Sequence, residues 1–144
     1  MTGKAGLTML LRRFAVALAT AMTTGMAITG TLPAQAAPMH NIELHVVLHG
    51  SNAHPMATGT ASFESGDHGR ELDVHVSRIP GLAGSHLVVY VHGVRAGTMT
   101  VSRAGFAHLD RHRGVPACRS GQAIRVRTRS GTLVASGIFR RHHD

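Results

Sequence analysis

The sequence predicts a single small all-β domain, an antiparallel β-sandwich of seven to eight strands with Ig-like or Greek-key connections. Three observations predict this fold. Apolar and polar residues alternate from residue 40 onward, and turn-forming glycines recur at short intervals. A third is that no stretch after residue 36 repeats its apolar residues at helical spacing. A small closed barrel would show the same strand pattern, so it remains the alternative.

Four segments show the alternation most clearly, with apolar residues on one side and polar residues on the other. The expected buried positions are Ile42, Leu44, Val46 and Leu48; Leu72, Val74 and Val76; Leu87, Val89 and Val91; and Ile124 and Val126. Two more strands are expected over about 57–65 and 132–139. Gly66-Asp67-His68-Gly69 and Ser130-Gly131 supply the residues of hairpin turns.

The first 36 residues have the features of a secretory signal peptide: a basic start, an apolar stretch over 14–28, and small residues at Ala34-Gln35-Ala36. Threonines and a glycine dilute the apolar stretch, which disfavours a retained membrane anchor. The pair Arg12-Arg13 offers an alternative, a twin-arginine signal for the export of folded proteins, although the polar residues that flank the arginines in such a signal are missing. We expect a signal peptide over 1–36, a short segment over 37–41, the β-sandwich over 42–140 and a polar tail over 141–144.

Residues 37–144 contain 12 arginines, no lysine and seven acidic residues, so their net charge is about +5 with neutral histidine. This charge favours anionic surfaces, and we expect an envelope polymer or an extracellular protein as partner. Export and the near absence of aromatic residues argue against nucleic acid. Cys118 is the only cysteine, and its small apolar neighbours predict a buried thiol.

Parts of the chain resemble known families. The stretch 48–55 (LHGSNAHP), followed by 58–63 (TGTASF), resembles the opening of CHRD (chordin-type) domains. Val91-His92-Gly93 is similar to the histidine-containing strand of that family, although Tyr90 stands where its paired His-x-His has the first histidine. Over about 42–140 the glycine turns and core positions also resemble small exported bacterial β-sandwich proteins of unknown function. Both resemblances imply a fold, and neither implies a catalytic residue.

Twelve histidines lie between residues 40 and 143, a high frequency for so short a chain. Five of them fall on the polar side of their strands and are expected to face water: His45, His49, His75, His86 and His92. Imidazole is a common ligand of zinc and copper, and residues on adjacent strands come within about 5.5 Å of each other. The sequence therefore predicts a zinc or copper site that combines His75 with His86 or His92. Scattered surface histidines that bind no metal would give the same pattern.

Arg125, Arg127 and Arg129 alternate along one predicted strand and share one face. Because guanidinium groups bind carboxylate, sulfate or phosphate in a bidentate manner, this face is a candidate anion-binding site. The alternative is a solvated strand face that discourages edge-to-edge aggregation.

No catalytic signature is present. The sequence lacks a Gly-x-Ser-x-Gly elbow and a phosphate-binding glycine loop. Glu71 with Asp73, and Asp110 between His108 and His112, offer carboxylates and imidazoles without a nucleophile. We therefore expect a secreted, non-catalytic binding or structural module of the cell envelope or extracellular space. The alternative is a periplasmic or extracellular histidine-rich protein that binds copper or zinc.

Overall fold

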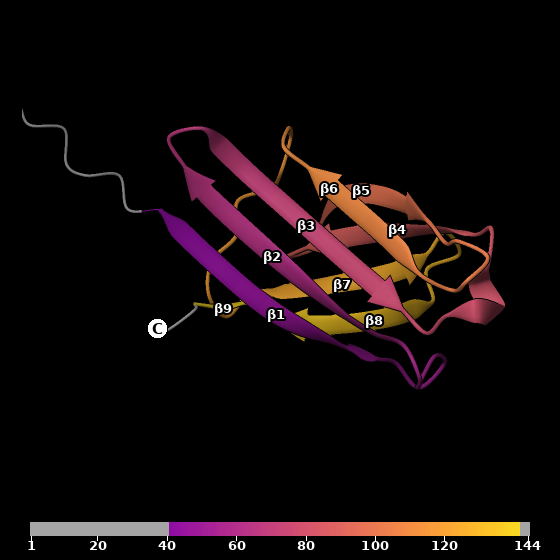
Figure 1. The fold of residues 1–144 in the computed structure, drawn as a ribbon. Helices are drawn as coiled ribbons and strands as arrows, with labels where there is room; N and C mark the ends of the chain where they lie inside the picture. Colours follow the sequence, from indigo (N-terminus) through magenta and orange to yellow (C-terminus); the bar gives the residue numbers. More distant parts are fainter. Residues whose placement is uncertain (1–40, 142–144) are drawn as a thin grey trace, which may run out of the picture. The chain divides into compact units, whose positions relative to one another are not determined.

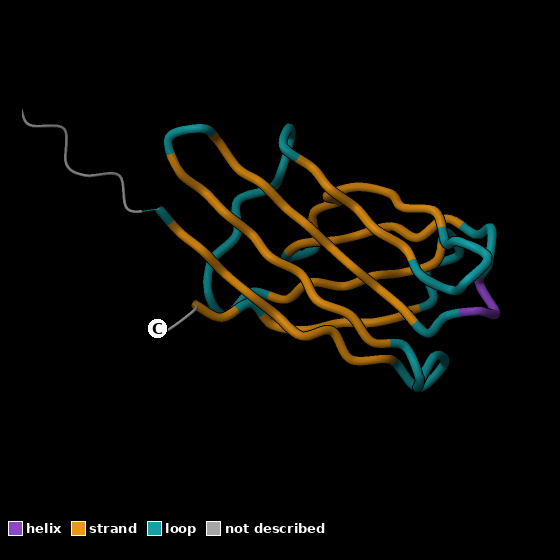
Figure 2. The backbone as a smooth tube through the Cα atoms, in the orientation of Figure 1, coloured by secondary structure: helices purple, strands orange, loops and turns teal. Residues whose placement is uncertain are grey.

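The computed structural model describes residues 41–141 (Figures 1 and 2), so the expected signal peptide over 1–36 lies outside the described residues. The described range forms nine strands and one short 3-10 helix: β1 (Ile42–Gly50), β2 (Thr58–Gly66), β3 (Gly69–Ser77), η1 (Pro80–Leu82), β4 (His86–Val91), β5 (Val94–Thr100), β6 (Ala107–Arg111), β7 (Ala123–Thr128), β8 (Leu133–Ile138) and β9 (Arg140–Arg141). Within that range, no helix has the length and apolar character needed to cross a membrane.

The strands are antiparallel and follow the order β5-β4-β7-β8-β1-β2-β3-β6. Figure 1 shows β1, β2, β3 and β6 as one layer and β4, β5, β7 and β8 as the other. The layers are joined where His49 and Gly50 of β1 pair with β8, and β9 pairs with the other half of β1. The predicted antiparallel sandwich is confirmed, and its strand path nearly closes on itself because β5 lies next to β6.

The core lies between the two layers and is built from the apolar side of each strand. Leu44, Leu48, Leu72 and Leu87 are fully buried, as the alternation predicts. Phe63 on β2 and Phe139 after β8 meet edge to face, with ring centroids 6.5 Å apart. Val88 is also buried although it lies on the polar side of β4, between Thr98 of β5 and Arg127 of β7.

The strand expected over 132–139 is β8 in the structure, and a two-residue strand outside the predicted range, β9, follows it. The chain passes very close to β1 at Gly137, where a Cβ atom would lie 2.3 Å from Val46 Cγ2 and 2.6 Å from the Val47 carbonyl oxygen. Only glycine fits so close an approach. The segment pairs with β1 through Ala135 and Ser136 before Gly137 and through Arg140 and Arg141 after it, in the same register.

Cys118 lies in the β6–β7 connection and packs into the core, where it is 4% exposed. Burial raises the pKa of its thiol from 9.0 to about 11, while a weak bond to the Arg119 carbonyl opposes the shift. The thiol ionises at a lower pH in the unfolded chain than in the folded protein. We therefore expect the free energy of unfolding to be highest below about pH 9 and to fall by about 2 to 3 kcal/mol at most as the pH rises to 11. Urea denaturation at several pH values measures this loss.

The matched control for that prediction is Cys118→Ala, which removes the titrating thiol. The difference in stability between the two proteins is expected to change between pH 9 and pH 11 and to be constant below pH 9. A difference that stays constant over the whole range would contradict the prediction.

Candidate metal centre

A row of histidines and carboxylates lies on the outer face of the layer formed by β1, β2, β3 and β6. Alternate residues of a strand share a face, so Glu71, Asp73 and His75 of β3 all project outward. The antiparallel register with β6 places Asp73 opposite Asp110 and His75 opposite His108. Two strands that are far apart in the sequence therefore bring imidazoles and carboxylates together.

The first cluster consists of Asp73, His75 and His108. The Asp73 carboxylate lies 3.1 Å from His75 Nε2 through Oδ1 and 2.9 Å from His108 Nε2 through Oδ2. The two imidazole rings are stacked, with centroids 4.1 Å apart and planes 9° from parallel. The Asp73 carboxylate thus contacts both imidazole rings, and the Nε2 atoms of His75 and His108 both point toward it.

The spacing of these three groups fits a single metal ion. Zinc lies about 2.0–2.2 Å from nitrogen and oxygen ligands, so two ligands of one ion are at most about 4.4 Å apart. One donor atom from each of the three residues lies within 4.8 Å of the others. Shifts of a few tenths of an ångström would bring them to coordination distance. The side chains of His75 and His108 are 58% and 45% exposed, so an ion can reach them from solvent.

The second cluster, Glu71, Asp110 and His112, lies next to the first, on β3, on β6 and just after the end of β6. His112, the residue after β6, contacts Glu71 at 3.3 Å through Nδ1 and Asp110 at 2.9 Å through Nε2. Its donor atoms also lie within 4.8 Å of one another. With two carboxylates and one imidazole, this cluster is richer in oxygen and more exposed than the first.

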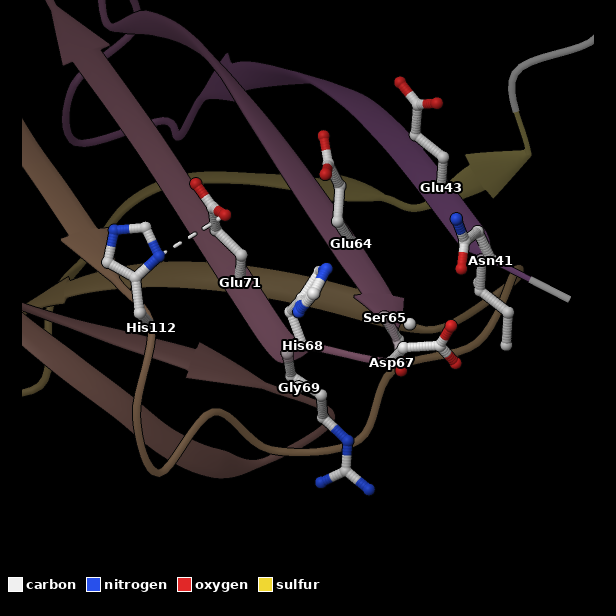
Figure 3. Close-up of a pocket in the computed structure, with 12 residues that line it drawn as sticks. Asn41, Glu43, Glu64, Ser65, Asp67, His68, Gly69, Glu71 and His112 are labelled. Atoms are coloured by element: carbon white, nitrogen blue, oxygen red, sulfur yellow. Dashed lines mark ion pairs between the residues drawn. The ribbon is translucent and has the colours of Figure 1, made fainter. Parts of the chain in front are cut away.

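Further carboxylates extend the row toward β1. Glu43, Glu64 and Glu71 lie directly opposite one another on β1, β2 and β3, and they line a shallow hollow of about 380 Å³ with His112 (Figure 3). Like charges in register destabilise a sheet. Nearby Arg70 donates to the Val115 carbonyl and forms no ion pair with these carboxylates. A bound cation on this face would relieve the repulsion.

The structure places His75 in one layer and His86 in the other, and no group of three potential ligands among the described residues combines His75 with His86 or His92. His86 lies on β4, in the other layer, where its Nδ1 is 3.0 Å from Thr100 Oγ1. His92 lies in the β4–β5 turn with a φ of +48°, and its backbone N–H donates to the Ala123 carbonyl. His75 instead joins Asp73 and His108, which the sequence did not identify as its partners.

The polar alternation at 71, 73, 75 and at 108, 110, 112 is visible in the sequence, but the pairing of the two segments is not. β4 and β5 lie between them in the chain, so no hairpin turn sets their register. Of the three predicted anion-binding residues, Arg125 and Arg127 lie on β7 in the other layer, and Arg129 is exposed in the turn after it.

Comparison of the chain with known protein families and with curated protein sequences finds no match.

Proposed function

We propose that this protein is an exported, non-catalytic binding module that holds a zinc or copper ion on the outer face of β3 and β6. The convergence of Asp73, His75 and His108 carries the proposal, because their metal-binding atoms lie within 4.8 Å of one another, which is a few tenths of an ångström from the spacing that one ion requires. Two imidazoles select for zinc or copper over calcium and magnesium, which prefer oxygen ligands.

Three protein ligands leave a coordination position for water or an external ligand. The imidazoles would bind through Nε2, so the proton on each ring must then lie on Nδ1. The site is on an open sheet face, without the enclosure that excludes water from catalytic centres. Together with the lack of a catalytic signature in the sequence, this supports metal capture or storage in preference to catalysis.

The second cluster would accept an additional ion more weakly, since His112 is its single imidazole. Export follows from the signal-peptide features of residues 1–36, and the resemblance to CHRD domains and to small exported β-sandwich proteins agrees with it. An envelope polymer or an extracellular protein remains the proposed partner class.

Equilibrium dialysis of the purified protein against zinc and against copper tests the proposal. We expect at least one ion per chain with submicromolar affinity. The double variant His75→Gln/His108→Gln is expected to lose at least a hundredfold in affinity, because it removes both nitrogen ligands and keeps side chains of similar polarity. His86→Gln is the matched control and is expected to bind normally, since it removes an exposed imidazole from the other layer.

Binding of zinc and copper by the unaltered protein only at millimolar concentrations, without a defined stoichiometry, would overturn the proposal. So would equal affinities of the double variant and the control, which would place the binding on other histidines. Thermal melting without metal establishes that both variants are folded.

A further inference from the structure

Carboxylates are confined to one of the two outer faces of the sandwich, although arginines occur on both. Every carboxylate side chain in residues 41–141 lies on β1, β2, β3 or β6, or in the β2–β3 turn: Glu43, Glu64, Asp67, Glu71, Asp73 and Asp110. The layer formed by β4, β5, β7 and β8 has none, and its strands carry Arg95, Arg125 and Arg127. Figure 1 shows these two layers as separate sides of the domain. The metal-binding face proposed above and the arginine-bearing face thus point in opposite directions.

The register of β5, β4 and β7 gathers the arginines around one aromatic residue. Tyr90 of β4 is paired with Arg95 on one side and with Arg125 on the other, and Val88 is paired with Arg127. Neighbouring strands are about 4.8 Å apart, so the backbones of Arg95 and Arg125 are roughly 10 Å apart, with Tyr90 between them. We call Arg95, Arg125, Arg127 and Tyr90 the arginine face.

A β-bulge places Arg95 in this group. The β4–β5 register shifts between Val89, which pairs with Gly97, and Tyr90, which pairs with Arg95. The extra residue is Ala96, which is buried together with Gly97. Without the shift, Arg95 would be out of phase with Tyr90 and would point toward the core, because side chains alternate between faces. Bulges commonly re-aim a side chain in this way.

The guanidinium groups of the arginine face are not neutralised. Arg95 donates to Thr98 Oγ1 at 2.7 Å, and Arg127 donates to the Gly131 carbonyl at 2.8 Å. No arginine in residues 41–141 forms an ion pair with a carboxylate. Each of these side chains keeps further N–H donors directed to solvent, since a guanidinium has five.

We propose that the arginine face binds an anionic polysaccharide that bears carboxylate or sulfate groups. Two cations on either side of an aromatic ring match an extended chain whose sugar ring lies against Tyr90 and whose charged groups reach Arg95 and Arg125. Planar guanidinium groups bind such anions in a bidentate manner. A single tyrosine is too little for the repeated base stacking of single-stranded nucleic acid. Interfacial membrane binding gains much of its strength from apolar side chains that insert, and the central apolar side chain of this face, Val88, is buried.

The proposal does not depend on the metal site, because the two faces belong to different layers. It predicts an exported protein attached to an acidic polymer by one face, while the histidine-bearing face remains open to solvent. Metal binding and polymer binding should therefore be separable by mutation.

Binding of the purified protein to heparin and to polygalacturonate, measured by calorimetry at pH 7.5 and 150 mM salt, tests the proposal. The triple variant Arg95→Gln/Arg125→Gln/Arg127→Gln is expected to bind at least tenfold more weakly. The matched control, Arg103→Gln/Arg119→Gln/Arg141→Gln, removes the same charge from exposed residues outside the arginine face and is expected to lose less than threefold. Tyr90→Ala is expected to weaken binding severalfold and to leave its salt dependence unchanged, because it removes no charge.

Equal losses in the two triple variants would overturn the proposal, since they would show attraction by net charge alone. Absence of binding to both polysaccharides at 150 mM salt would also overturn it. Tighter binding to single-stranded DNA or to anionic phospholipid vesicles than to either polysaccharide would assign the face to another class of partner. The variant His75→Gln/His108→Gln is expected to bind both polysaccharides normally.

Discussion

Zinc at a hundred times its dissociation constant is expected to raise the free energy of unfolding by about 2.7 kcal/mol, because it binds the folded chain and not the separated ligands. For a domain of this size that corresponds to a rise in melting temperature of roughly 10 to 20 °C. The effect requires the folded register of β3 and β6, which brings Asp73 to His75 and His108. Calorimetric melting with and without zinc at pH 7.5 measures it.

Two controls connect this stabilisation to the first cluster. At pH 5 it should largely disappear, because protons compete with the metal for imidazole nitrogen. Asp73→Asn should reduce it strongly, since the variant removes the carboxylate that approaches both rings. Equal stabilisation of the wild type and of His75→Gln/His108→Gln would contradict the prediction.

Phe63→Ala is expected to lower the free energy of unfolding by about 3 to 5 kcal/mol. Phe63 is 1% exposed on β2 and meets Phe139 edge to face, so its loss leaves a cavity where the two layers meet. Urea denaturation measures the change. Val47→Ala, at a side chain of the same layer that is 56% exposed, is the control and is expected to change stability by less than about 0.5 kcal/mol. A loss below about 1 kcal/mol for Phe63→Ala would contradict this account of the core.

Much of the fold could be predicted because the relevant signal is local. The apolar side of β1 follows directly from residues two apart, and the buried Leu44, Val46 and Leu48 confirm it. The β2–β3 hairpin was also predictable, because Gly66 and Gly69 are close in the sequence and pair across the turn. The burial of Cys118 followed from its apolar neighbours.

The candidate site could be predicted only in part. The surface position of His75 followed from its strand, but its partners Asp73 and His108 did not, because the register of β3 with β6 has no local signal in the sequence. The arginine face shows the same limit. Arg125 and Arg127 share one strand, whereas Arg95 joins them through a bulge that has no local signature in the sequence.

The sequence by itself determined which side of each strand faces the core, because burial in a sheet depends on a repeat of two residues that any short segment displays. Only the tertiary structure decided which outward side chains become neighbours. β3 and β6 are separated in the chain by two strands of the opposite layer, and their register depends on how the whole core packs. The clustering of metal ligands on one face and of guanidinium groups on the other follows from that packing.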